Sequence, residues 1–258
     1  MAAAGSFGEN VELVNTAARS GIVLVCEHAS NFIPEDFSNL GLDDKTLNSH
    51  AAWDPGALAV AKLMSAKLDA PLVATGVSRL VYDCNRPLVA ESAIPKKSEI
   101  YEIPGNVGLS NSDRAERAER FYQPFRAALK ETLDSGIQKI AVISVHSFTP
   151  VFHGKPRKLE LGILHDEDTR LADALLSVIR QEGSLNARSN DPYGPEDGVT
   201  YTLNEHARPR DLLNAMFEIR NDLIADDRGQ QAMAERLTGY LQLALSALGA
   251  NQKKAVSS

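Results

Sequence analysis

Two histidines in this chain follow runs of apolar, mostly β-branched residues. His28 comes two residues after the run 22–26, and His146 ends the run that begins at Ile140. Short unbroken apolar runs are typical of strands buried on both faces, as in a parallel sheet. One such histidine can simply cap a loop, but two of them favour a site at the carboxyl ends of the strands, where open α/β sheets bind ligands. Neutral histidine is also the commonest ligand for zinc.

A catalytic zinc site needs a third protein ligand, and the segment 50–54 offers two candidates. His50 and Asp54 are four residues apart, so they share one face if the segment is helical. Asp54 has an alternative role, because an aspartate before Pro55 can cap a helix. The residues alone leave the choice between His50 and Asp54 open. Three further histidines lie in loop-like contexts and are expected at the surface: His153, His165 and His206.

The segment 78–87 contains two arginines, an aspartate and an asparagine around a short apolar centre. Guanidinium groups bind carboxylates in a bidentate manner, and an asparagine amide adds donors. We therefore expect Arg79, Asn85 and Arg86 to hold an anionic substrate. The alternative is a structural ion pair between Asp83 and one of the two arginines.

One carboxylate, Glu218, lies inside the apolar run 216–220. Burial of an unpaired carboxylate costs free energy, and it raises the pKa toward a value suited to a general base. We therefore expect Glu218 to be functional.

The composition of the whole chain is that of a soluble enzyme-sized protein. Its 258 residues are 43% hydrophobic and 24% charged, and the net charge is −7. An acidic chain is not expected to bind nucleic acid or anionic membranes, although a local arginine cluster can still hold a small anion. Cys26 and Cys84 form no disulfide framework or CxxC motif. The sequence has no signal peptide and no apolar stretch of about 18 residues, which favours a reduced, cytoplasmic enzyme.

The order of apolar and amphipathic segments predicts an α/β fold. Strands are expected at 21–26, 71–75, 80–83, 140–145, 159–164 and 216–220, and helices at 54–68, 112–135, 168–182 and 229–248, with Ser112 as the cap of the second helix. This alternation predicts a mostly parallel mixed sheet flanked by helices. One domain is expected over 10–250, between a flexible leader (1–9) and a flexible tail (251–258). Residues 88–112 are read as a long loop that can cover the pocket.

Six blocks of the chain, in order, resemble the N-formylglutamate amidohydrolase family. They are CEHASNFIP, HAAWDPGA, SRLVYDCNRP, ISVHSF, NDPYGPEDGVTYTL and FEIRNDL, and they extend from about Ile22 to Leu223. That family is similar to the zinc carboxypeptidases and succinylglutamate desuccinylases, which implies a phosphorylase/hydrolase-like fold. Its members hydrolyse an N-acyl amide of an acidic amino acid, and the namesake reaction releases formate from N-formyl-L-glutamate.

The resemblance also implies roles for particular residues. His28 and His146 would bind the metal, and Glu218 would act as base or acid on a metal-bound water. Asn85 and Arg86 would hold the α-carboxylate of the substrate. The HxxE spacing of the carboxypeptidases has Asn31 here, so Asp54 or His50 must supply the remaining ligand. Typical family members carry a DxDWH-like segment where this chain has HAAWD, so the histidine and the carboxylate have exchanged places.

The resulting expectation is one Zn²⁺ per chain, held by His28, Asp54 and His146. Arg79 would offset charge on the oxyanion, and Tyr201, in the turn 198–201, would donate to the substrate. Two other readings stay open: a hydrolase of another N-acyl amino acid or small peptide, and a catalytically silent protein that keeps the arginine clamp without metal. The sequence leaves the acyl group, the metal and the oligomeric state undecided.

Overall fold

The computed structural model describes residues 10–250, so the predicted leader and tail lie outside the described residues. Its main feature is a seven-stranded sheet in the order β1-β3-β2-β6-β11-β9-β10. The strands are β1 (Val11–Val14), β2 (Ile22–Cys26), β3 (Leu72–Thr75), β6 (Ala141–Phe148), β9 (Leu161–Leu164), β10 (Ala187–Ser189) and β11 (Leu213–Arg220). The four central strands β3, β2, β6 and β11 are parallel, whereas β1 on β3 and β9 on β11 are antiparallel. The predicted mostly parallel mixed sheet is confirmed.

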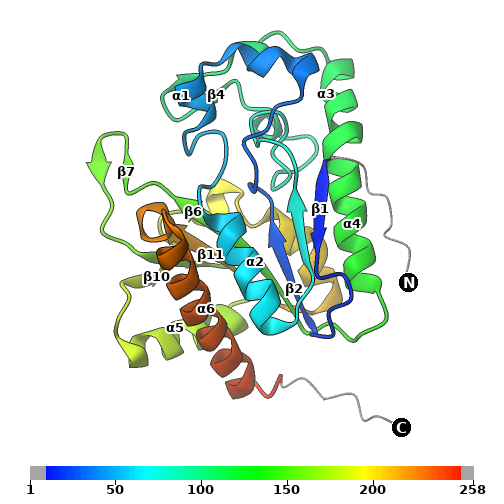
Figure 1. Cartoon of the computed structure of the whole chain (residues 1–258). Coiled ribbons are helices and arrows are strands. Elements are labelled where there is room, and N and C mark those ends of the chain that lie inside the picture. Colours follow the sequence, from blue (N-terminus) through cyan, green and yellow to red (C-terminus); the bar gives the residue numbers. More distant parts are fainter. Residues whose placement is uncertain (1–9, 251–258) are drawn as a thin grey trace.

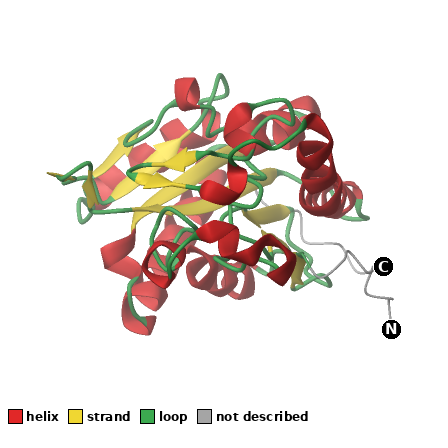
Figure 2. Cartoon of the chain, turned by 90° about the horizontal axis from the view of Figure 1, so that it is seen from above, coloured by secondary structure: helices red, strands yellow, loops and turns green. Residues whose placement is uncertain are grey.

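Helices pack on both faces of this sheet (Figures 1 and 2). Three of them form one apolar layer with the sheet: α2 (Ala57–Leu68), α5 (Arg170–Glu182) and α6 (Asp227–Ala247). The opposite layer contains α4 (Gln123–Asp134), which continues from α3 (Asn111–Arg117) through a π-helical turn, together with the loop segments around residues 77–107 and 199–212. None of the described helices is both long and apolar enough to cross a membrane.

Alternation of side chains along the strands divides the core between these layers. Val23 and Val25 of β2 pack in the α4 layer, and Leu24 and Cys26 pack against α2. The same alternation in β6 and β11 directs polar side chains at their carboxyl ends toward the α4 side. All five residues of β2 are buried, as expected for a strand covered on both faces.

Short elements outside the main sheet complete the fold. They are α1 (Asp44–Leu47), the hairpin β4–β5 (Lys97–Ser98 and Tyr101–Glu102) and the hairpin β7–β8 (Val151–Phe152 and Lys155–Pro156). The first hairpin lies within the predicted loop 88–112, which is therefore partly structured. A π-helical turn at Leu203–Ala207 precedes β11.

Several predicted boundaries are wrong, and each has a local cause. Residues 80–83 form no strand, because Ser78 accepts backbone hydrogen bonds from Val81 and Tyr82 and closes a turn. The cap of the second predicted helix is Ser110, which forms a capping box with Asp113, and not Ser112.

Two other predictions failed because tertiary contacts were not visible in the sequence. Strand β6 does not end at His146 but continues to Phe148, because β11 pairs with it along its whole length. His206 is buried at 5% exposure, whereas His153 is exposed as expected and His165 is half-buried. The edge strand β1 was not predicted at all.

Candidate active site

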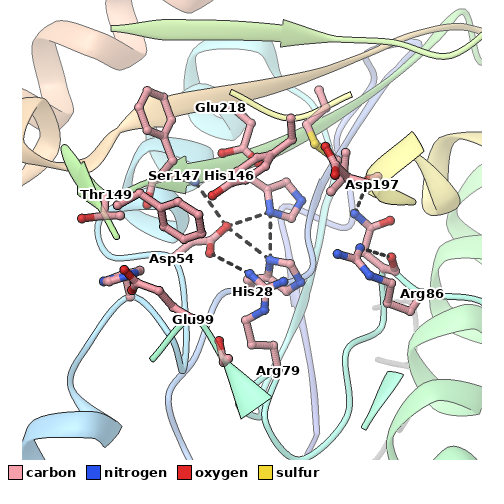
Figure 3. A pocket seen from close by; sticks show the side chains of 18 residues that line it. His28, Asp54, Arg79, Arg86, Glu99, His146, Ser147, Thr149, Asp197 and Glu218 are labelled. Carbon is pink, nitrogen blue, oxygen red and sulfur yellow. Dashed lines mark hydrogen bonds and ion pairs between the residues drawn. The ribbon is translucent and has the colours of Figure 1, made fainter. Parts of the chain in front are cut away.

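A cavity of about 300 Å³ opens at the carboxyl ends of β2, β6 and β11. Its wall includes seven of the eight residues to which the sequence assigned a role: His28, Asp54, Arg79, Asn85, Arg86, His146 and Glu218. Figure 3 shows these side chains converging from strand ends and from the loops that follow them. This position agrees with the expected location of ligand sites in open α/β sheets.

His28, Asp54 and His146 meet at the centre of this cavity, and all three are buried. Nδ1 of His146 is 2.7 Å from Oδ2 of Asp54 and 3.1 Å from Nδ1 of His28. Nδ1 of His28 is 3.3 Å from the same Asp54 oxygen. Figure 3 shows this triangle of atoms as dashed lines. Of the two candidates for the third ligand, the structure places Asp54 in the cluster.

Backbone contacts hold the three segments together. The amide of Asp54 donates to the carbonyl of His28 at 2.9 Å, which ties the segment before α2 to the end of β2. The amide of Ser147 donates to Oδ2 of Asp54, and its hydroxyl donates to the carbonyl of Pro55. Asp54 does not cap α2 with its side chain, because the N-cap residue is Gly56.

The outer nitrogen of each clustered imidazole faces a second carboxylate. Nε2 of His28 is 2.8 Å from Oδ1 of Asp83, and Nε2 of His146 is 3.0 Å from Oε2 of Glu27. Both histidines therefore direct Nδ1 toward Asp54.

This donor set fits a divalent metal. Zinc bonds of about 2.0–2.1 Å place the ligands of a tetrahedral site about 3.3 Å apart. Two of the observed separations, 3.3 and 3.1 Å, are close to this value, and the third, 2.7 Å between His146 and Asp54, is shorter. The surrounding carboxylates Glu27, Asp54 and Asp83 are all buried, and among the described lysines and arginines only Arg79 forms an ion pair with any of them. A divalent cation would balance the excess negative charge.

The same contacts explain the acidities of these carboxyl groups. Burial disfavours the charged form of Asp54, but His28 and His146 outweigh it and hold the pKa well below its usual value. For Asp83, burial is likewise outweighed by His28 and Arg79, and the pKa falls well below the ordinary range. The pKa of Glu27 falls to about 2, because His146 and the hydroxyl of Ser144 overcome its burial. All three are therefore ionised at neutral pH.

The pKa of Glu218 is shifted in the opposite direction, upward. Glu218 pairs in register with His146 across the β6–β11 ladder, and burial raises its pKa to about 7. Its Oε2 atom is buried and has no hydrogen-bond partner among the described residues. On its other side lies Gly162 of β9, where an added Cβ would come within 3.1 Å of the Cβ of Glu218. A half-protonated carboxyl group with a free oxygen is suited to proton transfer.

Arg79, Asn85 and Arg86 of the segment 78–87 also line the cavity. Arg79 pairs with Oδ2 of Asp83 at 3.0 Å, and its Nη1 atom lies 3.6 Å from Asp54. The side-chain Nδ2 atom of Asn85 donates to the carbonyl of Val199, and its Oδ1 atom accepts from the backbone amide of Thr202. These contacts fix the segment 198–202 against the site.

Arg86 is half-buried, and its Nη1 atom donates to the carbonyls of Asn85 and Gly198. No group of residues 10–250 accepts a hydrogen bond from its remaining guanidinium donors, which leaves them available to an anion. Asp83 forms an ion pair with Arg79, one of the two structural pairs that the sequence offered as an alternative.

Tyr201 is not brought into the cavity wall. Its hydroxyl lies 2.6 Å from that of Tyr122, and donation to a substrate would require this contact to break. His50 lines the cavity but stands apart from the metal cluster, because its Nε2 atom is 2.7 Å from Oε2 of Glu99.

Glu27 and Glu99 are two site residues to which the sequence reasoning gave no role. An acidic residue directly after a fully apolar strand was the available signal for Glu27. No local pattern marks Glu99, which reaches the cavity from the tip of the β4–β5 hairpin and accepts from the amide of His153 in the β7–β8 hairpin.

Solved structures of other proteins resemble this chain to different degrees. A gene product of Agrobacterium tumefaciens, Atu2144, is 50% identical, with a TM-score of 0.90, over 95% of this chain and 98% of that chain. An N-formylglutamate amidohydrolase from Ralstonia eutropha JMP134 is similar in fold, with a TM-score of 0.61 at 18% identity, over 95% of this chain and 100% of that chain. A metallo-carboxypeptidase from Burkholderia cenocepacia has a TM-score of 0.41 at 8% identity, over 92% and 61% of the two chains. A search of curated proteins gives no match.

The sequence blocks that surround the site are also those of a recognised family. The family model of N-formylglutamate amidohydrolase matches residues 20–225, which include every residue of the cavity wall. This chain belongs to the N-formylglutamate amidohydrolase family.

Proposed function

We propose that this chain is a metal-dependent amidohydrolase that cleaves the N-acyl amide of a small anionic amino acid, with N-formyl-L-glutamate as the first substrate to test. The observation that carries the proposal is the unpartnered Glu218 carboxyl group, whose pKa is about 7, beside three converging metal-binding atoms. A carboxylate with a pKa of about 7 can take a proton from water at neutral pH and pass it on to the leaving nitrogen.

His28, Asp54 and His146 would hold one Zn²⁺, which would supply Lewis-acid polarisation of the amide carbonyl and would lower the pKa of water in the site. Glu218 would take the proton from the attacking water at Oε2 and pass it to the leaving nitrogen. Arg79, at the edge of the cluster, would offset negative charge on the carbonyl oxygen.

The substrate carboxylate would be bound by the free donors of Arg86. Asn85 Nδ2 has two N–H groups and uses one on Val199, so the second can add to the same clamp. A volume of about 300 Å³ is at the small end of ligand sites, which suits an acylated amino acid. The cytoplasmic location stays a prediction of the sequence, and no nucleic-acid or membrane partner is proposed.

A second substrate class has its own support in the cavity wall. The wall carries the carboxylates of Glu99 and Asp197 and three aromatic rings, those of Phe148, Phe152 and Tyr193. A substrate with a second carboxylate would have to approach these anions. An N-acyl amino acid with an uncharged side chain is therefore the alternative substrate.

The test is metal analysis of the purified protein together with hydrolysis of N-formylated amino acids, including glutamate, with and without a chelator. We expect about one zinc per chain and chelator-sensitive formate release. Zinc without hydrolysis of N-formyl-L-glutamate, but with hydrolysis of an uncharged analogue, would favour the second class. A protein that takes up no metal and cleaves nothing after zinc is added would be the silent binding protein.

Glu218→Gln tests the role of the base itself. We expect kcat to fall by about 10²–10⁴-fold, as is usual when a general base is removed, with the zinc content unchanged. Near-normal turnover by a zinc-loaded Glu218→Gln enzyme would show that the assigned role is wrong.

A further inference from the structure

We propose that Glu27 is the positioning residue that holds His146 in the orientation and tautomer needed to bind a metal. This inference rests on the proposed metal site and adds a residue to which no metal or catalytic role has been given. The proposed role of Glu27 is to orient a metal-binding side chain, and Glu27 takes no part in the chemical step.

The geometry of Glu27 is specific. Its Oε2 atom faces Nε2 of His146 at 3.0 Å and accepts from the hydroxyl of Ser144 at 2.6 Å. Ser144 lies two residues before His146 on β6, so their side chains share one face of the strand. The pairing of Val25 with Ser144 places Glu27, two residues farther along, level with His146.

A purely structural role does not explain this carboxylate. The Glu27 side chain has 0% exposure, and an ionised carboxylate without a partner is costly to bury. Among the described residues no lysine or arginine forms an ion pair with it, and its Oε1 atom has no hydrogen-bond partner. Within residues 10–250, its one ion pair is with the outer nitrogen of a proposed metal ligand.

The adjacent residues Glu27 and His28 therefore serve different parts of the same centre. His28 supplies one ligand atom, while Glu27 orients the other histidine, whose Nδ1 faces Asp54. Asp83 plays the corresponding part for His28, but it also pairs with Arg79. Substitution of Asp83 would disturb two functions at once, whereas Glu27 offers the cleaner test.

The experiment measures the zinc affinity of the full-length protein by competition with a chromophoric chelator. A matched control is Glu99→Gln, because Glu99 also faces the Nε2 atom of a histidine, at 2.7 Å, but that histidine, His50, is outside the cluster. We expect Glu27→Gln to weaken zinc binding by about 10–100-fold, as for other partners of ligand histidines, and Glu99→Gln to leave the affinity unchanged.

Two further measurements separate positioning from folding. The Co²⁺-loaded protein should show altered visible absorption in Glu27→Gln, which a general loss of stability would not cause. If Glu27→Gln does not fold, Ser144→Ala removes a hydrogen bond from the same carboxylate, and it should weaken zinc binding several-fold.

The outcomes are distinct. Wild-type affinity in Glu27→Gln, or in Ser144→Ala where the first variant is insoluble, would overturn the inference and leave the proposed function intact. Absence of zinc binding by the wild-type protein would overturn the proposed function, and the inference with it.

Discussion

Glu27, after β2, and Glu218, on β11, are buried carboxyl groups on either side of β6, and their surroundings shift their pKa values in opposite directions. Glu27 has an imidazole and a hydroxyl as partners, so its pKa falls to about 2. Glu218 is just as buried but has a free oxygen, so its pKa rises to about 7. Environments that separate the pKa values of nearby acids are typical of catalytic sites. One group can hold a fixed charge while the other exchanges a proton.

His206 permits a pH test that is independent of the metal. It lies in the π-helical turn Leu203–Ala207 at 5% exposure, and burial lowers its pKa to about 4, with Arg210 and Arg126 adding to the effect. The unfolded chain binds a proton at this residue below about pH 6.5, whereas the folded chain does so only below about pH 4. Stability from this residue is therefore complete above pH 6.5 and is lost as the pH falls toward 4.

We expect the free energy of unfolding of the wild-type protein to fall by about 2 kcal/mol more than that of His206→Gln between pH 7.5 and pH 5. Urea unfolding of both proteins in the presence of chelator measures the difference. Equal losses in the two proteins would show that His206 is not kept neutral by the fold.

At the scale of elements, strand β9 lies close to both β11 and the backbone of Asp191 at Gly162. Gly162 pairs with Glu218 across β9 and β11, and a side chain there would also collide with the backbone carbonyl of Asp191. Glycine in a strand often marks such a close approach.

Gly162→Ala should therefore destabilise the protein by about 1–3 kcal/mol, as overpacking does, and should lower kcat/KM by displacing Glu218. The matched control is Gly239→Ala in helix α6, where an added Cβ meets nothing within 4 Å. That change should stabilise the protein by up to about 1 kcal/mol, because alanine favours helix. Urea unfolding and steady-state kinetics of both variants are the measurements, and full activity in Gly162→Ala would contradict the account of β9.

These elements also show what the sequence can predict. Apolar runs such as those of β2 and β11 mark buried strands without further information, and Glu218 stands out as a charge within such a run. The turn at 80–83 could not be recognised, because its hydrogen bonds to Ser78 compete with a pattern that fits a strand. The partner of Glu27 lies 119 residues away, and contacts over such distances leave no local periodicity.

At the scale of the whole molecule, the proposed metal would act as a cross-link. Its three ligands come from segments that meet only in the folded chain: the end of β2, the segment before α2, and β6. Binding to the folded state alone stabilises a protein by mass action.

Zinc at 100 times its Kd should therefore add about 2.7 kcal/mol of stability, which corresponds to about 5–10 °C in Tm for a chain of this size. Thermal unfolding with zinc and with chelator measures the shift. Magnesium, which prefers six oxygen ligands, is the control and should have little effect. A Tm that zinc does not raise would count against the metal site.

The hairpins β4–β5 and β7–β8 form a part of the cavity that is separate from the sheet. His28, His146 and Glu218 lie at the carboxyl ends of β2, β6 and β11, whereas the outer wall of the cavity comes partly from the hairpins β4–β5 and β7–β8, which Glu99 joins. Exchanging these hairpins for those of a relative would leave the sheet and its buried acids in place. Under the proposed function, replacement of these two surface loops would change which substrates enter the cavity and would leave the proposed metal ligands and Glu218 unchanged.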